Sequence, residues 1–149
     1  MAQLSFHSPI GDLTLSEEEG RIVSLDWGWA RDQRATPLLN QARDQVQDYL
    51  AGKRKDFDLP LDPMGTDFQK RVWKAMVAIG YGKTKSYGEI AAKLKSSPRA
   101  VGTACGRNPI PLIIPCHRVL GANGGLGGYS GEGGTDTKRW LLNLEGLTA

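Results

Sequence analysis

The segment 113–119, which reads Ile-Ile-Pro-Cys-His-Arg-Val, holds the residues best suited to chemistry in this chain of 149 residues. Cys116 and His117 are adjacent, and Pro115 directly precedes them. A thiol attacks as its thiolate, and a neighbouring imidazole or cation lowers the pKa of the thiol towards neutrality. The pattern therefore predicts an activated, nucleophilic sulfur at Cys116.

Cysteine and histidine are sparse, which limits the other chemistry of the chain. The two cysteines, Cys105 and Cys116, and the two histidines, His7 and His117, do not follow zinc-ligand spacing, so we expect no metal. No apolar run of 18 residues predicts a membrane span, and no secretory signal precedes the first strand. Together with the sparse cysteines, this favours a reducing, cytoplasmic location, or a nucleus if the source has one.

Charge is distributed unevenly along the chain, although the net charge is only +3. Residues 1–64 contain 7 basic and 11 acidic residues, whereas residues 65–149 contain 12 basic and 5 acidic residues. A basic half is typical of a protein that binds a polyanion such as nucleic acid, but it is also typical of a solvated basic face. Charge alone leaves both interpretations open.

The first part of the chain predicts a small antiparallel sheet. Apolar and polar residues alternate in three short segments, 4–6, 13–15 and 23–27, which are separated by turn signals. Such a sheet needs a cover for its apolar face. The predicted cover is a helix with Thr36 as N-cap and Pro37 at its first position, whose apolar stripe is Leu38, Ala42, Val46, Tyr49 and Leu50.

A proline-containing segment, 53–65, predicts a linker, and we place the domain boundary near residue 62. The sequence thus predicts an N-terminal α/β domain at 1–62 and a second domain at 63–149. The fold class is α/β: a small antiparallel sheet with a helix, then a mainly helical, winged-helix-like domain.

Local signals predict four helices in the second part. Capping boxes at 66–69 and 86–89 start two of them, a third runs from about Arg99 to Arg107, and the last covers about 135–144. The second and third are short and joined by Lys95-Ser96-Ser97. This spacing predicts a helix-turn-helix, a pattern that many helical hairpins share.

The third of these helices has an unusual surface for a DNA reader, because its residues are small. Ala100, Gly102 and Thr103 lie between Arg99 and Arg107. Small residues allow the helix backbone to approach DNA closely, and they equally permit packing against another helix. The two arginines favour DNA. A glycine-rich segment, 121–134, predicts either a loop that closes over a pocket or a flexible surface loop.

Several blocks together resemble one family. These are Pro-Cys-His-Arg-Val at 115–119, Asn-Pro-Ile-Pro at 108–111, Tyr-Ser at 129–130, Arg-Ala-Val-Gly at 99–102, and Trp-Leu-Leu at 140–142 with Glu-Gly at 145–146. They resemble the O6-alkylguanine-DNA alkyltransferases, which are DNA repair proteins. The resemblance covers residues 64–147 in detail, and the first 60 residues only in pattern.

The resemblance implies a role for each residue of the active-site segment. Cys116 would accept the alkyl group, and His117 would take the thiol proton through a water molecule. Glu145 would orient the imidazole, and Asn108 would brace the active-site turn. The chain would then transfer an alkyl group from O6 of guanine, and possibly from O4 of thymine, irreversibly to itself without a cofactor.

The resemblance also implies how DNA is held. Tyr87 would help rotate the damaged nucleotide and donate a hydrogen bond to guanine N3, while Arg99 would fill the gap in the base stack. The partner would be double-stranded DNA carrying O6-alkylguanine, bound by a monomer through its minor groove. The remaining residues implied by the resemblance are, for DNA, Ala100, Gly102, Thr103 and Arg107, and, for the base pocket, Pro111, Val119, Tyr129 and Ser130.

Two other functions fit parts of the pattern. A non-catalytic alkyltransferase-like protein would bind alkylated DNA and recruit other repair proteins, but such proteins have another residue at the position of Cys116. A thiol hydrolase would use a Cys-His-Glu relay, but its histidine normally lies far from its cysteine in sequence. Adjacent Cys116 and His117 therefore argue against a hydrolase.

Overall fold

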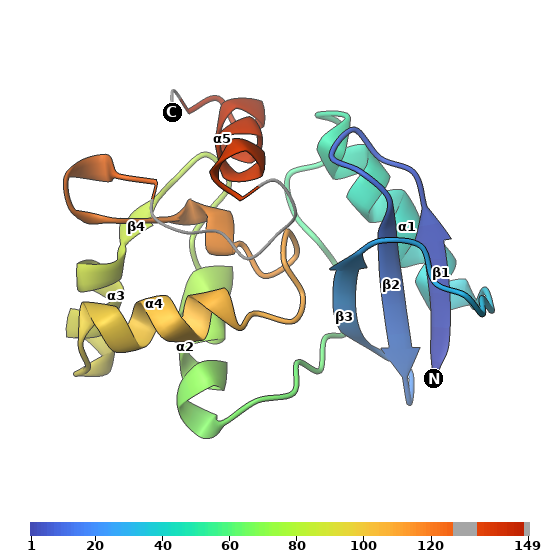
Figure 1. The fold of residues 1–149 in the computed structure, drawn as a ribbon, viewed down its shortest axis with the longest axis horizontal. Coiled ribbons are helices and arrows are strands. Elements are labelled where there is room, and N and C mark those ends of the chain that lie inside the picture. Colours follow the sequence, from blue (N-terminus) through green and yellow to red (C-terminus); the bar gives the residue numbers. More distant parts are fainter. Residues whose placement is uncertain (127–133, 148–149) are drawn as a thin grey trace. The chain divides into compact units, whose positions relative to one another are not determined.

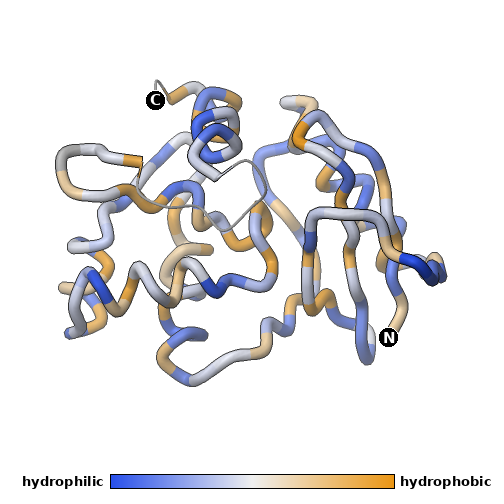
Figure 2. Tube along the Cα trace, in the orientation of Figure 1, coloured by the Kyte–Doolittle hydropathy of each residue, from blue (hydrophilic) through white to orange (hydrophobic). Residues whose placement is uncertain are grey.

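A computed structural model describes residues 1–126 and 134–147 of the chain. The chain divides into two compact units, residues 1–64 and residues 65–149 (Figure 1). Among the described residues, no helix combines the length and apolar character needed to cross a bilayer. Hydrophobic positions occur along each strand of the first unit and in every helix of the second (Figure 2).

The first unit is a three-stranded antiparallel sheet covered by one helix. Strands β1 (Ala2–Phe6), β2 (Leu13–Glu18) and β3 (Arg21–Trp27) follow one another in the order β1-β2-β3. Helix α1 (Pro37–Leu50) packs on β1 and β2 (Figure 1). This confirms the predicted sheet-plus-helix arrangement.

In the third strand, the residue that faces the core is not the one that we predicted. Pairing shifts register between Ser16 and Glu17, so that Ser16 pairs with Ser24 but Glu17 pairs with Ile22. Val23 is the extra residue of this irregularity and stays partly exposed, whereas Ile22 is fully buried. Strict alternation cannot anticipate this, because one inserted residue moves the following side chains to the opposite face.

Helix α1 starts as predicted but presents a neighbouring residue to the core. The Thr36 hydroxyl accepts a hydrogen bond from Leu39 N at 3.0 Å, and Pro37 occupies the first turn. Leu39 is fully buried, while Leu38, which we expected in the stripe, is partly exposed. Leu39 lies three residues before Ala42 and so continues the buried stripe.

The predicted linker contributes to the first unit. Ile22 N donates to Pro60 O at 2.9 Å, and Asp62 N donates to Ile22 O at 2.8 Å. Leu61 thereby forms a parallel bridge with Ile22. The segment just before the second unit is thus tied to the edge of the sheet.

The second unit contains the four predicted helices, α2 (Asp67–Val77), α3 (Tyr87–Leu94), α4 (Pro98–Gly106) and α5 (Thr135–Leu144). Thr66 and Ser86 each form a complete capping box, and Ser97 caps α4. Lys95 turns the chain between α3 and α4 with a φ of 56°. Helix α4 packs on α3 and α2, which is the arrangement expected of a helix-turn-helix.

Short elements that local signals did not predict connect the helices to the Cys116 segment. Strand β4 (Lys85–Ser86) pairs in parallel with β5 (Val119–Leu120), and the 3₁₀ turns η1 (Cys116–Arg118) and η2 (Ala122–Gly124) flank β5. Two-residue parallel pairs join segments far apart in sequence, so no local pattern reveals them. Through β4, the start of α3 is held beside the residue that follows η1.

Candidate active site

The loop before Cys116 is held by the side chain of Asn108. Its Nδ2 donates to Ile114 O at 2.8 Å, and its Oδ1 accepts from Ile110 N at 2.9 Å. Ile114 N donates to Ile110 O at 2.9 Å, which closes the turn. Leu112 within it has a φ of 72°, a left-handed conformation that side-chain-bearing residues rarely adopt. Asn108 therefore stabilises a turn that the backbone alone would not favour.

Cys116 opens the 3₁₀ turn and is almost completely buried, with 4% of its surface exposed. Burial raises the pKa of its thiol, while a hydrogen bond from Asn108 and the charge of Lys138 act in the opposite direction. Our expectation that the neighbouring imidazole brings this pKa towards neutrality is therefore wrong for the resting protein. A buried thiolate loses more solvation than these neighbours return.

His117 is fully buried and hydrogen-bonded to a carboxylate. Its Nε2 lies 2.7 Å from Oε2 of Glu145, whose side chain is also fully buried. This partner assigns the ring proton to Nε2 and the lone pair to Nδ1. Burial lowers the pKa of His117, against the raising effect of Glu145. The imidazole is therefore neutral at neutral pH and able to accept a proton.

Arg118 is a site residue that sequence reasoning missed. Its Nε and Nη2 donate to the two oxygens of Glu145 at 2.9 and 3.1 Å, and its Nη1 donates to Ile79 O at 2.6 Å. The guanidinium is buried, so this fork neutralises Glu145 out of water. The sequence did contain a signal for this role: Arg118 is a charged residue inside an apolar run, and a charged residue that is buried there needs a partner of opposite charge.

Gly82 is another hydrogen-bond partner of Glu145. Its backbone N donates to Oε1 of Glu145 at 3.0 Å, and its φ is +73°. A Cβ at this position would lie 3.3 Å from the backbone oxygen of Glu145. Glycine is required here because the backbone has a positive φ and because a side chain would crowd the backbone oxygen of Glu145.

Gly82→Ala is expected to lower the free energy of unfolding by about 1–2 kcal/mol, because alanine is strained at this φ. It should also slow any reaction that needs Glu145 in place. Urea unfolding checks the first effect. Gly88→Ala is the matched control: Gly88 lies in α3 and its added Cβ would meet Ser86 Oγ at an ordinary 3.8 Å. Equal stability of the two variants would contradict this account of Gly82.

Tyr87 begins α3 and lies on the side of Cys116 and Cys105. Burial, followed by the charges of Cys105 and Cys116, raises the pKa of its hydroxyl to about 12. The hydroxyl therefore keeps its proton at neutral pH and is a hydrogen-bond donor. A Cβ added at Gly102 would lie 4.0 Å from the Tyr87 ring, so α4 passes close to this ring.

Helix α4 turns most of its predicted DNA-facing residues outwards. Arg99, Thr103 and Arg107 are exposed, and Ala100 and Gly102 are partly exposed. The helix packs inwards through Val101, Ala104 and Cys105. The small residues that we assigned to DNA binding are thus accessible. Ala104, in contrast, packs against the rest of the unit, which was the other use that we gave for small residues in this helix.

Two of the predicted pocket residues lie in the segment around Cys116: Pro111 bridges to Ile114, and Val119 directly follows η1. Pro111 and Val119 are buried, and Val119 O accepts a hydrogen bond from Lys138 Nζ at 2.7 Å. Tyr129 and Ser130 lie outside the described residues.

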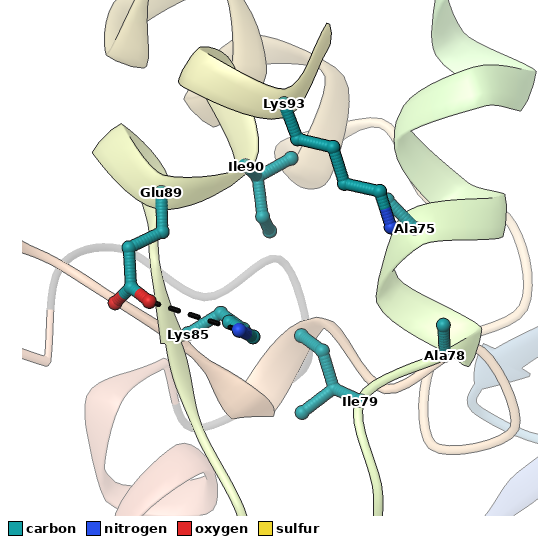
Figure 3. A pocket seen from close by; sticks show the side chains of 7 residues that line it. All are labelled: Ala75, Ala78, Ile79, Lys85, Glu89, Ile90 and Lys93. Atoms are coloured by element: carbon teal, nitrogen blue, oxygen red, sulfur yellow. Dashed lines mark ion pairs between the residues drawn. The ribbon is translucent and has the colours of Figure 1, made fainter.

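A small pocket elsewhere in the second unit is lined by none of the predicted site residues (Figure 3). Its apolar lining is formed by Ala75 of α2, Ile90 of α3, Ala78 and Ile79, and the lining residues Lys85 and Glu89 make an ion pair of 3.8 Å. Its volume of about 120 Å³ is below the roughly 300–1,000 Å³ of typical ligand sites.

Comparison with known proteins identifies the family of the chain. The family described as "6-O-methylguanine DNA methyltransferase, DNA binding domain" matches residues 67–147, and "6-O-methylguanine DNA methyltransferase, ribonuclease-like domain" matches residues 3–63. The constitutive methylated-DNA--protein-cysteine methyltransferase of Bacillus subtilis is 44% identical over 154 residues, covering 95% of this chain and 93% of the relative. That of Mycobacterium bovis is 47% identical over 150 residues, covering 93% and 88%.

The solved structures include close relatives of the whole chain. Mycobacterium tuberculosis OGT in complex with DNA superposes with a TM-score of 0.89 at 43% identity, covering 100% of this chain and 96% of that one. The O6-methylguanine DNA methyltransferase of Methanococcus jannaschii gives a TM-score of 0.70 at 30% identity, covering 98% and 95%. Both halves of the chain and its active-site segment therefore have the same relatives, and the chain belongs to the 6-O-methylguanine DNA methyltransferase family.

Proposed function

We propose that this chain repairs DNA by moving an alkyl group from O6 of guanine irreversibly to Cys116. The observation that carries the proposal is the buried Cys116 thiol, which is adjacent to His117 and its bond to Glu145. This centre lies in the unit that matches the family's DNA-binding domain. We take residues 63–149 as the DNA-binding alkyltransferase domain and residues 1–62 as a supporting domain.

The reaction would be one in-line displacement. The Cys116 sulfur forms a bond to the alkyl carbon as the bond from that carbon to guanine O6 breaks, and the electron pair leaves with guanine. The thiol proton passes through a bridging water to neutral His117. The departing guanine anion takes up one proton from water and becomes neutral guanine. The product thioether has no polarised carbonyl for water to attack, so each protein molecule acts once.

Tyr87 supports the departing guanine in this proposal. With a pKa of about 12, its hydroxyl is a poor acid but a reliable donor of a hydrogen bond to guanine N3. Ser130, which the structure does not describe, is proposed as the donor to O6, with Tyr129 against the base. Val119 and Cys116 would offer backbone carbonyls to the guanine amino group, and Pro111 would wall the pocket.

The buried position of Cys116 requires the nucleotide to leave the duplex. Extruding a base costs a few kcal/mol, and the vacancy must be filled. Arg99 lies exposed near the start of α4, where its planar guanidinium can stack between bases. The accessible small residues of α4, with Arg107 at its end, suit docking into a minor groove, where base identity is read poorly.

Arg99→Ala is expected to slow transfer from duplex DNA by about tenfold or more, while transfer from free O6-benzylguanine changes little. The free base needs no extrusion, so only the duplex reaction loses the stacked side chain. Single-turnover rates on both substrates check this. Arg31→Ala, an exposed arginine of the first unit, is the matched control. Equal slowing on both substrates would remove the flipping role.

The proposal includes a cytoplasmic location, where reducing conditions keep Cys116 as a free thiol. It also includes a monomer that requires no cofactor. The non-catalytic alternative predicts DNA binding without transfer, and the thiol hydrolase predicts cleavage of an ester or peptide. Incubation with methyl-labelled duplex separates the three: label should become bound to protein and stop at one equivalent. Continued turnover, or binding without transfer, would overturn the proposal.

A further inference from the structure

The pocket of Figure 3 is one part of a longer groove that lies between α2 and α3 and continues along the connecting segment 78–85. Three hollows adjoin in this α2–α3 groove: Ala78 lines all three, and Lys85 and Lys93 each line two. The apolar part of the lining is formed by Ala75, Ala78, Ile79, Ile90 and Leu94. An elongated surface of this kind suits a segment of chain better than a small molecule.

The rim of the α2–α3 groove is basic. Its lining includes one carboxylate, Glu89, and five cations, all of them exposed: Arg71, Lys74, Lys83, Lys85 and Lys93. Glu89 is paired with Lys85. Within residues 1–126 and 134–147, no carboxylate forms an ion pair with the other four cations. The rim therefore carries positive charge that an acidic partner would neutralise.

An apolar lining inside a cationic rim indicates the class of partner. A duplex backbone would supply phosphates but no apolar surface to cover Ile79 and Ile90. None of the residues that the resemblance assigns to DNA lines the groove. An acidic amphipathic helix supplies both features, because its apolar side chains recur every three or four residues and its carboxylates flank them.

The dimensions of the groove agree with a short helix. From Arg71 to Ala78 the chain rises about 10 Å along α2, which corresponds to about two turns of a bound helix. Lys93 extends from α3 towards Ala75 of α2 (Figure 3). Its aliphatic stem adds to the apolar surface, while its ammonium is free to meet a carboxylate at the rim.

We propose that the α2–α3 groove is a docking surface for a short acidic amphipathic helix of another protein. Apolar side chains of that helix cover Ala78, where the three hollows meet, and its carboxylates pair with Lys74 and Lys93 on either side. The surface is separate from the alkyl-transfer centre, because neither Cys116 nor Glu145 lines it. It would connect a DNA repair protein to a partner without engaging its nucleophile.

The contact is expected to be weak and sensitive to salt. A helix of two or three turns buries less area than a stable protein interface, so the dissociation constant should lie at about 1–100 μM. The rim charges are exposed, so added salt should screen them and weaken binding.

The test begins with a display library of 12-residue peptides in which Asp, Glu, Lys, Arg, Leu, Phe, Ala and Ser are equally frequent. Selection uses the full wild-type chain with excess unmodified duplex DNA, which occupies the DNA-binding face. The peptides that bind the double variant Lys74→Gln and Lys93→Gln are removed. Those that remain are expected to be net acidic, with apolar residues three or four positions apart.

Anisotropy titrations with an enriched peptide then measure the effect of each feature. The double variant should bind about tenfold more weakly, because two ion pairs are lost. Ala78→Gln, which places a longer neutral side chain where the hollows meet, should also weaken binding at least about tenfold. The matched control combines Arg31→Gln and Lys53→Gln, two exposed cations of the first unit, and should bind as the wild type does. Affinity for unmodified duplex should change less than about twofold in the groove variants.

Four results would overturn the inference. The first is a library that enriches no acidic peptides, and the second is equal binding by the groove variants and the control. The third is a loss of duplex affinity as large as the loss of peptide affinity, which would assign the rim to DNA. The fourth is self-association of the wild type in sedimentation that the groove variants abolish, which would assign the groove to a second copy of this chain.

Two further measurements keep the outcome clear. Peptide-induced chemical-shift changes in the wild type need no variant and should gather within residues 71–94; changes elsewhere would contradict the assignment. If the wild-type protein accepts no methyl group, the proposed function fails, whereas the peptide titrations still decide about the groove.

Discussion

Cys116→Ala is expected to abolish alkyl transfer completely while alkylated duplex is still bound. The reaction needs one sulfur, and no other described residue offers a comparable nucleophile beside His117. Transfer is measured with methyl-labelled duplex, and binding by a gel-shift or anisotropy titration. Because alanine lacks only the sulfur, the buried site should keep its backbone hydrogen bonds.

Cys105→Ala is the matched control for this experiment. Cys105 is also buried, with its sulfur 3.3 Å from that of Met76, and burial raises the pKa of its thiol to about 12. It is therefore protonated at neutral pH and serves packing, so its alanine variant should retain transfer. Protein-bound label in Cys116→Ala, or its loss in Cys105→Ala, would contradict the assignment.

Glu145→Gln is expected to have the second largest effect, on stability and on transfer together. Glu145 accepts hydrogen bonds from His117, Arg118 and Gly82. Neutralising it leaves the buried guanidinium of Arg118 without its counter-charge, which costs about 3–5 kcal/mol of folding free energy. Transfer should fall about 10²-fold, because His117 loses the carboxylate that stabilises its protonated form.

Two further variants separate these effects. Glu89→Gln removes a carboxylate of an exposed capping box and ion pair, and it should cost less than about 1 kcal/mol. Glu145→Gln combined with Arg118→Met removes both buried charges, so stability should recover in part while transfer stays slow. Urea unfolding and single-turnover rates at low temperature measure both. Recovery of transfer together with stability would show that Glu145 serves folding alone.

Much of the fold could be predicted because its helices begin with local signals. Thr36, Thr66, Ser86 and Ser97 each cap the helix that their sequence context indicates. Such signals depend on residues three or four positions apart. The shifted register around Ile22 and the β4–β5 pair depend on distant partners, and local patterns do not contain that information.

The site was predicted in part for the same reason. The adjacency of Cys116 and His117 is visible in the sequence, and the resemblance supplied Glu145, which the structure places 2.7 Å from the imidazole. Arg118 and Lys138 were missed because charged residues are usually exposed. Both are buried here by long-range partners, Glu145 and Val119 O.

The raised pKa of Cys116 could not be foreseen, because desolvation is set by the whole fold around a residue. Adjacency suggested an imidazole that primes the thiol. The structure instead buries the thiol, and the loss of solvation raises its pKa despite the opposing effects of Asn108 and Lys138.

The most direct test of the account is the intact mass of the wild-type protein after incubation with excess duplex containing O6-methylguanine. We expect each protein molecule to gain one methyl group, with the modification mapped to the peptide that contains Cys116. Folded, reduced protein that keeps its original mass, or that carries the methyl group on another residue, would contradict the central claim.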